Sequence, residues 1–305
     1  MPPKKPLLVC VVGPTAIGKT ALAIKIAVAF STEIISADSR QFFKEMSIGT
    51  AVPSEEELNA APHHFIQNIS IFDEYSVGDF EREALSRLDA LFKEHSIAVM
   101  VGGSGLYVDA VVKGLDKFPE VPVTIREGLN TDLQNKGIGF LQKELQEVDP
   151  EYFHKVDVQN PHRLIRALEV YRANGKPYSS FLRKKSAERN FETLYIGLSA
   201  ERETVYNRIN ERVDIMIAEG LIEEAKQLFI HKEKNALQTV GYRELFEYFE
   251  GNFTLEHAIA EIKKNTRRFA KRQKTWFKKN TSIEWFDYKT DSKEIINLIK
   301  EKNAS

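Results

Sequence analysis

Eight residues near the N-terminus have the types and spacing of a phosphate-binding loop. They match the pattern G-x-x-x-x-G-K-[ST] and lie between a short apolar run and a helical pattern, as that motif requires. Glycines let the backbone curl so that successive N–H groups point at one anion, and the following helix adds the positive end of its dipole. The lysine adds a full charge, and the final hydroxyl suits Mg²⁺. The residues are Gly13, Pro14, Thr15, Ala16, Ile17, Gly18, Lys19 and Thr20.

This loop predicts a site for two linked phosphates but leaves the reaction open, because nucleotides and other diphosphate esters share those groups. A nucleotide hydrolase or kinase usually has a second acidic residue at the end of a strand, where it helps to hold the metal. Here the apolar run 97–101 ends in Gly102, Gly103 and Ser104. The lack of an acid at this position disfavours phosphoryl transfer, but a small-molecule or nucleotide kinase remains an alternative.

A second candidate for chemistry is the carboxylate of Asp38. It follows the run 34–37, at the expected carboxyl end of the next strand, and ligands of doubly wound sheets gather at those ends. From its position, this carboxylate could act as a general base, bind a metal, or cap the next turn. The four side chains that follow suit contacts to a nucleotide but could equally be loop residues; they are Ser39, Arg40, Gln41 and Phe42.

A dense group of cations lies near the C-terminus. Nine of the seventeen residues 263–279 are Lys or Arg, and none is acidic. Ile262, Phe269 and Trp276 recur every seven residues, so we predict a helix that buries this stripe and turns its cations outward. Because the formal net charge of the chain is −1, this local concentration favours a surface for a polyanion over a general basic bias; a solvated helix face is the alternative. The basic segment 183–185 would extend that surface if the fold brings the two together.

The hydrophobic pattern predicts the elements that position these groups. The run 7–12 is continuous, rich in β-branched residues and followed by glycine and proline, which is typical of a strand buried on both faces. Strands that alternate with helices predict an α/β fold with a doubly wound, mostly parallel sheet of the P-loop type. The other predicted strands are 33–36, 97–101 and 194–198, and the helices between them are 19–30 and 78–95.

A small helical insert is predicted between the last two of these strands. Its borders, 113–122 and 174–190, have the composition of linkers, and the pattern between them is helical at 140–148 and 161–173. We therefore expect a catalytic core formed by 1–117 and 194–305, and an insert domain of 118–193. The C-terminal region of the core is almost wholly helical, with predicted helices at 201–219, 222–231, 242–249 and 255–279.

Composition excludes several classes of protein. With 305 residues, of which 42% are hydrophobic and 29% charged, the chain is neither fibrous nor largely disordered. Its longest apolar run is six residues, far below the ~20 that cross a bilayer, so we expect no membrane span or secretory leader. The single cysteine, Cys10, cannot form an intramolecular disulfide, which fits the reducing cytoplasm. His63 and His64 lack the clustering of a metal site and are expected to form hydrogen bonds.

Eight short motifs along the chain carry a resemblance to one known family. The phosphate loop alone is widely shared, but all eight in this order, over nearly the entire chain, are specific. Ser104 stands where the family commonly has Thr, which keeps the hydroxyl, and Val52 stands where Lys is frequent, which makes a charge there dispensable. Besides 13–20, the motifs are 38–41 (DSRQ), 48–51 (IGTA), 62–65 (PHHF), 101–107 (VGGSGLY), 163–170 (RLIRALEV), 238–244 (QTVGYRE) and 271–277 (KRQKTWF). Together they resemble the tRNA dimethylallyltransferases.

The resemblance implies transfer of a dimethylallyl group from its diphosphate to N6 of the adenosine at tRNA position 37, which is 3′ of the anticodon in tRNAs that read codons beginning with U. Asp38 would take the proton of the amine, and Ser104 would lie beside the reacting groups. Lys19, the loop amides and Mg²⁺ held at Thr20 would stabilise the departing diphosphate, which Arg212 would also reach. We expect the enzyme to be a cytoplasmic monomer.

The target base is stacked in the anticodon loop and must be extruded into a pocket, at a cost of a few kcal/mol. Contacts to the tRNA offset this cost. The resemblance places them in the substrate pocket, the insert and the basic helix. A non-catalytic RNA-binding protein is disfavoured, because it would not need a diphosphate loop beside an aspartate. The implied tRNA-binding residues are Asp38, Ser39, Arg40, Gln41, Ser104, Arg126, His162, Arg163, Leu164, Ile165, Arg166, Lys271, Arg272, Gln273, Lys274, Thr275, Trp276, Phe277 and Lys278.

Overall fold

The computed structural model describes residues 4–182 and 187–304, so the whole of the predicted basic segment 183–185, and the residue after it, lie outside the described residues. The chain divides into two compact units: Met1–Lys113 with Glu188–Ser305, and Gly114–Ala187. The division therefore falls a few residues before each end of the predicted insert. At the second end, Arg189 belongs to the first unit because its guanidinium donates to the backbone carbonyls of Ala110 and Val111.

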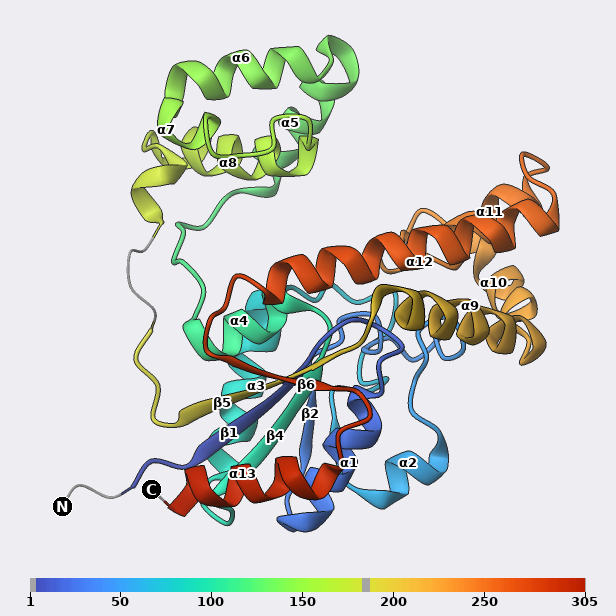
Figure 1. The fold of residues 1–305 in the computed structure, drawn as a ribbon. Coiled ribbons are helices and arrows are strands. Elements are labelled where there is room, and N and C mark those ends of the chain that lie inside the picture. The colour runs from blue at the N-terminus through green and yellow to red at the C-terminus, as the bar shows by residue number, and fades with distance from the viewer. Residues whose placement is uncertain (1–3, 183–186, 305) are drawn as a thin grey trace. The chain divides into compact units, whose positions relative to one another are not determined.

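The first unit is built on a six-stranded sheet with the order β3-β2-β4-β1-β5-β6 (Figure 1). Every pair of neighbouring strands is parallel, so the predicted α/β class is confirmed and the sheet is parallel throughout. The strands are β1 (Leu7–Val12), β2 (Ile34–Ser36), β3 (His63–His64), β4 (Ile97–Gly102), β5 (Glu192–Ser199) and β6 (Ile283–Asp287).

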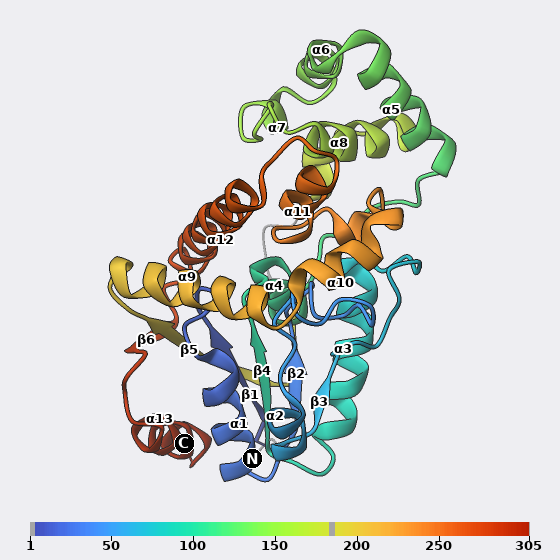
Figure 2. The same ribbon diagram turned by 90° about the vertical axis from the view of Figure 1, so that its right-hand side faces the viewer.

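Helices cover both faces of this sheet (Figure 2), as the continuous apolar run of β1 predicts. Alternate side chains of a strand point to opposite faces, so β1 contributes to two hydrophobic cores. One core contains Leu7, Val9 and Val11 with α1 (Lys19–Ala29) and α13 (Ser292–Ala304). The other contains Leu8, Cys10 and Val12 with α3 (Val77–Leu91) and α4 (Gly105–Lys113). Burial raises the pKa of the Cys10 thiol, so this residue is an unreactive part of the core.

The C-terminal helices lie over the carboxyl ends of the strands (Figure 1). They share a third core with the loop after β2, which includes Met46, Val213, Tyr242 and Ile262. In the described part of the chain, no helix combines the length and apolar character that a bilayer span needs. These helices are α9 (Arg202–Ala218), α10 (Leu221–Leu228), α11 (Tyr242–Phe249) and α12 (Leu255–Phe277), and α2 (Glu55–Ala60) is a short helix before β3.

The second unit is a helical domain with its own core, formed around Leu129, Leu141, Leu145 and Leu168. The local sequence explains where the helix Pro161–Asn174 begins: the Asn160 side chain accepts hydrogen bonds from two N–H groups of its first turn. The sequence analysis predicted the second and fourth of its helices but not the first or the third. The helices are α5 (Val123–Lys136), α6 (Ile138–Val148), α7 (Pro150–Phe153) and α8 (Pro161–Asn174).

The predicted buried stripe of α12 is wrong at two of its three positions. Trp276 is 40% exposed and Phe269 is half-buried, whereas only Ile262 is buried. Both rings contact polar groups at the border of the buried face: the Trp276 indole donates to the Asp109 carboxylate, and the Arg40 guanidinium lies over the Phe269 ring. The buried residues instead follow spacings of three, four and eight: Ala258, Ile262, Ala270, Gln273 and Phe277.

Candidate active site

The phosphate loop 13–20 connects β1 to α1 with the backbone that its glycines permit. Gly13 has a φ of 144°, and a side-chain carbon there would lie 2.6 Å from the carbonyl oxygen of Leu198. Gly18 precedes the first residue of α1 and has a φ of 103°, in the left-handed region. The loop therefore curls against β5, as the motif predicts.

A cavity of about 750 Å³ opens over this loop. Residues 15–20 form one wall, Asp38 with its neighbours Arg40 and Gln41 forms another, and Arg212 of α9 forms a third. Gly13 and Pro14 shape the loop but do not line the cavity. The structure thus brings together the predicted diphosphate ligands and the predicted base from three parts of the sequence.

Four cations line this cavity, Lys19, Arg40, Arg208 and Arg212, together with four carboxylates, Asp38, Glu55, Glu57 and Glu219. The pKa of Lys19 is lowered to about 8, mainly by burial; the Asp38 carboxylate opposes this shift, and the guanidinium groups of Arg212 and Arg40 add to it. Burial, together with Arg208 and Arg40, also lowers the pKa of Arg212. The Lys19 ammonium donates to the carbonyl of Pro14 at 2.8 Å. The partly desolvated cations Lys19 and Arg212, close to each other beside the phosphate loop, are typical of an anion-binding site.

The low pKa of Lys19 predicts a pH dependence of diphosphate binding. Lys19 is a cation below about pH 8 and loses its charge above it, so the affinity of the free enzyme for a diphosphate monoester should fall, by up to about tenfold per pH unit, as the pH rises past this value. A bound diphosphate favours the charged form, so binding near pH 8.5 should also take up a proton. Calorimetry with dimethylallyl thiolodiphosphate in buffers of different ionisation enthalpy measures both effects.

Lys19→Met is the control for this titration, because it removes the ammonium and keeps an unbranched side chain. The variant should bind the analogue weakly and lose the proton uptake. Proton uptake of the same size in Lys19→Met would assign the titration to another group.

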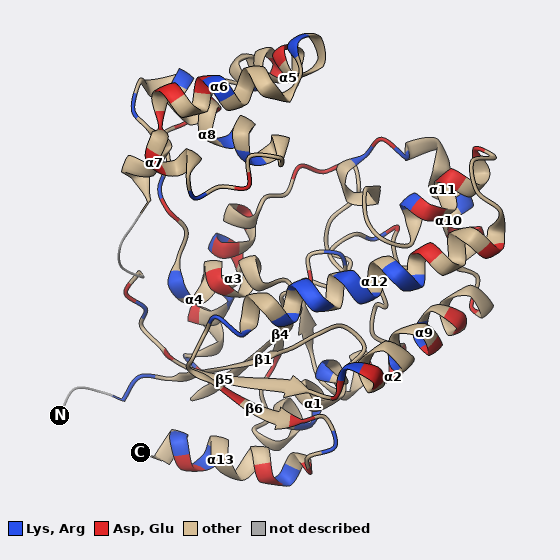
Figure 3. Cartoon of the chain, turned by 45° about the horizontal axis from the view of Figure 1, so that its top comes forward, with Lys and Arg blue, Asp and Glu red and all other residues tan. Residues whose placement is uncertain are grey.

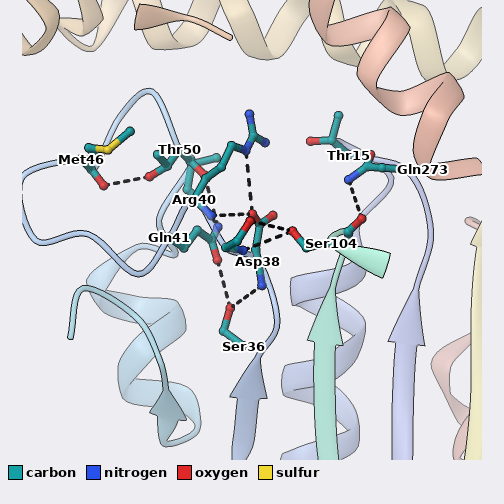
Figure 4. A network of polar contacts seen from close by, with 12 residues as sticks. Thr15, Ser36, Asp38, Arg40, Gln41, Met46, Thr50, Ser104 and Gln273 are labelled. Carbon is teal, nitrogen blue, oxygen red and sulfur yellow. Dashed lines mark hydrogen bonds and ion pairs between the residues drawn. The ribbon is translucent and has the colours of Figure 1, made fainter. Parts of the chain in front are cut away.

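Asp38 stands in a turn directly after β2, with its carboxylate on the cavity wall (Figure 4). Its Oδ1 accepts the backbone N–H of Arg40 at 3.3 Å and lies 3.8 Å from Arg40 Nε, and its side chain stays 20% exposed. Asp38 therefore caps its turn and also faces the cavity, so two of the functions predicted for it are compatible in one geometry.

Ser104 lies beside Asp38 but is not on the cavity wall. Its Oγ accepts the backbone N–H of Ser39 at 3.2 Å and lies 3.1 Å from Ser39 Oγ (Figure 4). The side chain of Gln41 donates to the carbonyl of Ala51 at 2.7 Å, which joins the Asp38 turn to the loop 46–51. The predicted serines and glutamine thus form the frame that holds the Asp38 turn.

Two residues that organise the cavity were not predicted. The Glu224 carboxylate, from α10, accepts the N–H groups of three successive loop residues at 2.9 to 3.0 Å, and the Tyr242 hydroxyl donates to it at 2.7 Å. Arg208 Nε donates to the carbonyl of Ala16 at 2.7 Å and supports the phosphate loop from α9. The three loop residues are Ser47, Ile48 and Gly49.

The donors around the cavity fit a metal that is held mainly by its substrate. The Thr20 hydroxyl and the Asp38 carboxylate are on the wall, and among the described residues no three His, Cys, Asp or Glu side chains form a metal-binding group. Few protein ligands are typical of Mg²⁺ bound together with phosphates. His63 and His64 instead form hydrogen bonds, to the Ala61 carbonyl and the Glu33 carboxylate, as expected.

Figure 3 shows cations along α12, and their partners divide these and the two lysines that follow the helix into two groups. Those in the first half have partners: Lys263 pairs with Asp214, and Arg267 donates to Asn210. Within 4–182 and 187–304, no ion pair is recorded for the second group. We call this second group the basic strip; it consists of Lys271, Arg272, Lys274, Lys278 and Lys279.

Four side chains implied as tRNA contacts are buried, which corrects that expectation. Gln273 and Phe277 face inward from α12, and Leu164 and Ile165 face the core of the second unit. Thr275 and Trp276 of the same α12 motif are exposed. The buried four position the exposed residues around them and do not themselves offer a surface.

In the second unit, the implied tRNA ligands Arg126 and Arg166 meet at one buried carboxylate. Glu169 is 2% exposed, and it accepts from Arg126 at 2.7 and 3.1 Å and from Arg166 at 2.6 Å. Both arginines remain partly exposed, so each keeps donors for another acceptor. His162 and Arg163 are exposed on the same helix, α8. The sequence analysis missed Glu169, although a lone acid within an apolar helical motif is a signal of a buried pair.

Comparisons with known proteins agree over almost the full length. The family model for IPP transferase matches residues 41–280. The chain is 61% identical to the tRNA dimethylallyltransferase of Christiangramia forsetii, over 97% of this chain and 98% of that protein. It is 58% identical to the tRNA dimethylallyltransferase of Flavobacterium johnsoniae, over 98% of both.

Solved structures show the same likeness. The full-length tRNA isopentenylpyrophosphate transferase of Bacillus halodurans is 36% identical, with a TM-score of 0.73 over 98% of this chain and 97% of that chain. A eukaryotic dimethylallyltransferase acting on tRNA is 24% identical and shares the fold, with a TM-score of 0.82 over 98% of this chain and 80% of that chain.

Proposed function

This chain belongs to the IPP transferase family, and from that premise we propose that it transfers a dimethylallyl group from dimethylallyl diphosphate to tRNA. The acceptor in this proposal is N6 of the adenosine at position 37, next to the anticodon in tRNAs that read codons beginning with U. The observation that carries the proposal is one cavity that contains both the phosphate loop and Asp38. The cavity can bind the diphosphate and, beside it, accept the proton of the adenosine amine that attacks.

In the proposed reaction, the lone pair of N6 attacks C1 of the dimethylallyl group, and the bond from C1 to the diphosphate oxygen breaks. The electron pair of that bond leaves with the diphosphate. The adenine amine is a poor nucleophile because its lone pair is delocalised into the ring, so loss of its proton must accompany bond formation. Asp38 accepts this proton and later releases it to solvent. Ser104 holds the Asp38 turn through Ser39.

The same cavity stabilises the leaving group. Negative charge grows on the diphosphate as the C–O bond breaks, and the loop amides, Lys19 and Arg212 are already in place to receive it. Mg²⁺ held at the Thr20 hydroxyl and at the diphosphate oxygens would supply further positive charge. These groups favour the transition state over the bound substrate because its diphosphate carries more charge.

The exposed cations of α8 and the basic strip are the proposed contacts to the anticodon stem-loop. The cavity is formed by one chain, which supports a monomer as the working unit, and the cytoplasm is the proposed compartment because the acceptor is tRNA. Contacts to phosphate release counterions, so binding should weaken steeply with salt.

A kinase is the alternative that the phosphate loop leaves open, and the family match favours prenyl transfer over it. The two are separated by incubating the full chain and unmodified tRNA with either labelled ATP or labelled dimethylallyl diphosphate. We expect the five-carbon unit on the tRNA, found by mass spectrometry at one adenosine. Hydrolysis or transfer of the ATP γ-phosphate at enzymatic rates, without prenylated tRNA, would reject the proposal.

A further inference from the structure

Gln273 is a buried side chain that joins α12 to both loops of the site. It is 5% exposed, and its Oε1 accepts the backbone N–H of Thr15 at 2.8 Å (Figure 4). Its Nε2 donates to the carbonyl of Gly103 at 3.0 Å. One carboxamide therefore holds the helix against the phosphate loop and against the residue that precedes Ser104.

The loop after β4 is shaped to receive this face of α12. A side-chain carbon at Gly103 would lie 2.1 Å from Gln273 Nε2, and one at Gly105 would lie 2.3 Å from the Trp276 ring. The same carbon at Gly103 would lie 3.7 Å from Lys19 Nζ, so the junction adjoins the ammonium of the diphosphate site. Two glycines thus permit a close contact that any other residue would push apart.

The outward side of the same helical turn carries cations of the basic strip. Lys271 and Arg272 precede Gln273, Lys274 follows it, and all three lack a recorded ion pair among the described residues. A polyanion that binds these cations would fix the position of this helical turn. The inner side of the same turn is hydrogen-bonded to Thr15 and Gly103 through Gln273. The inner and outer sides belong to one rigid element, because backbone hydrogen bonds hold a helical turn together.

We infer that Gln273 is a positioning residue that couples tRNA binding on α12 to diphosphate binding at the phosphate loop. This inference rests on the proposed function. RNA that binds the strip holds α12 in place, and the carboxamide then fixes Thr15, at the start of the loop amides, and Gly103, before Ser104. Each ligand should therefore raise the affinity for the other by the same factor, since coupling between sites is reciprocal.

The test measures that factor in the full chain with and without the carboxamide. The affinity for dimethylallyl thiolodiphosphate, which transfers its prenyl group slowly, is determined by calorimetry with and without a saturating anticodon stem-loop RNA. We expect the RNA to tighten binding roughly tenfold in the unmodified chain. Gln273→Met has a similar length and no polar atoms, and we expect its two affinities to be equal. A purely structural effect would weaken both affinities and keep their ratio.

A second variant displaces the carboxamide without changing it. Gly103→Ala places a carbon against Gln273 Nε2, at a residue that does not have a positive φ. In this variant too, we expect the affinities for the analogue with and without RNA to be equal. Gly128→Ala is the matched control, because a carbon there meets no atom within 4 Å; its ratio should equal that of the unmodified chain. Thermal melts of all variants establish that they fold.

The outcomes separate the inference from the function on which it rests. If the unmodified chain prenylates tRNA and a folded Gln273→Met or Gly103→Ala variant keeps the ratio, the coupling is refuted and the function stands. A ratio of one in the unmodified chain refutes it as well. If the unmodified chain adds no five-carbon unit to tRNA, the proposed function fails first.

Discussion

Asp38→Asn should lower the turnover of the enzyme by a factor of about 10²–10⁴ while its affinity for tRNA stays nearly unchanged. Asparagine has the shape of aspartate and can still accept the Arg40 N–H, so the cap of the turn is kept and the proton acceptor is lost. Single-turnover prenylation of unmodified tRNA measures the chemical step, and fluorescence anisotropy with a labelled anticodon stem-loop measures binding.

Asp38→Ala is the companion variant, because it removes both the proton acceptor and the cap. If Asp38 is the base, the two variants should be similarly slow, with Asp38→Ala also less stable by about 1 kcal/mol from the lost cap. If Asp38 only caps the turn, Asp38→Asn should retain near-normal turnover and Asp38→Ala should not. That second pattern would remove Asp38 from the chemistry.

Local patterns were sufficient to predict the centre of the fold. The run 7–12 is apolar at every position because β1 is covered on both faces, and glycine and proline end it where the phosphate loop begins. The edge strand β6 was missed because it is short and only one of its residues, Ile283, is buried. The helix α13, which follows it, was missed as well. The place of β6 in the sheet comes from pairing with β5, nearly a hundred residues away, and no local signal carries that information.

The candidate site was predictable where it follows from topology. Parallel strands place their carboxyl ends at one edge, so a loop after β1 and an acid after β2 lie on the same edge of the sheet, with only β4 between their strands. The supporting contacts were not predictable, because Glu224 holds backbone N–H groups about 175 residues earlier in the chain. Any acid on a helix surface looks alike in the sequence, and only tertiary packing selects the one that is buried against a loop. Gln273 was assigned to the RNA surface because the family resemblance covers its whole motif, and that resemblance does not tell which side chains of the motif face inward.

The basic strip should account for much of the salt dependence of tRNA binding. Replacing Lys271, Lys274 and Lys278 with Glu should weaken binding by a factor on the order of 10²–10³ at low salt. It should also reduce the slope of log affinity against log salt by about 1 for each lysine that contacts a phosphate. Titrations of the anticodon stem-loop at several salt concentrations measure both quantities.

The matched control reverses three lysines on or next to α13, on the other side of the first unit: Lys289, Lys293 and Lys300. Both triple variants change the net charge by the same amount, so an effect of overall charge on association appears in both, and contacts to phosphate appear only in the first. An unchanged slope in the α12 variant would identify the strip as a solvated helix face. Equal losses in the two variants would mean that RNA responds to total charge, and the basic strip would then have no specific function in binding.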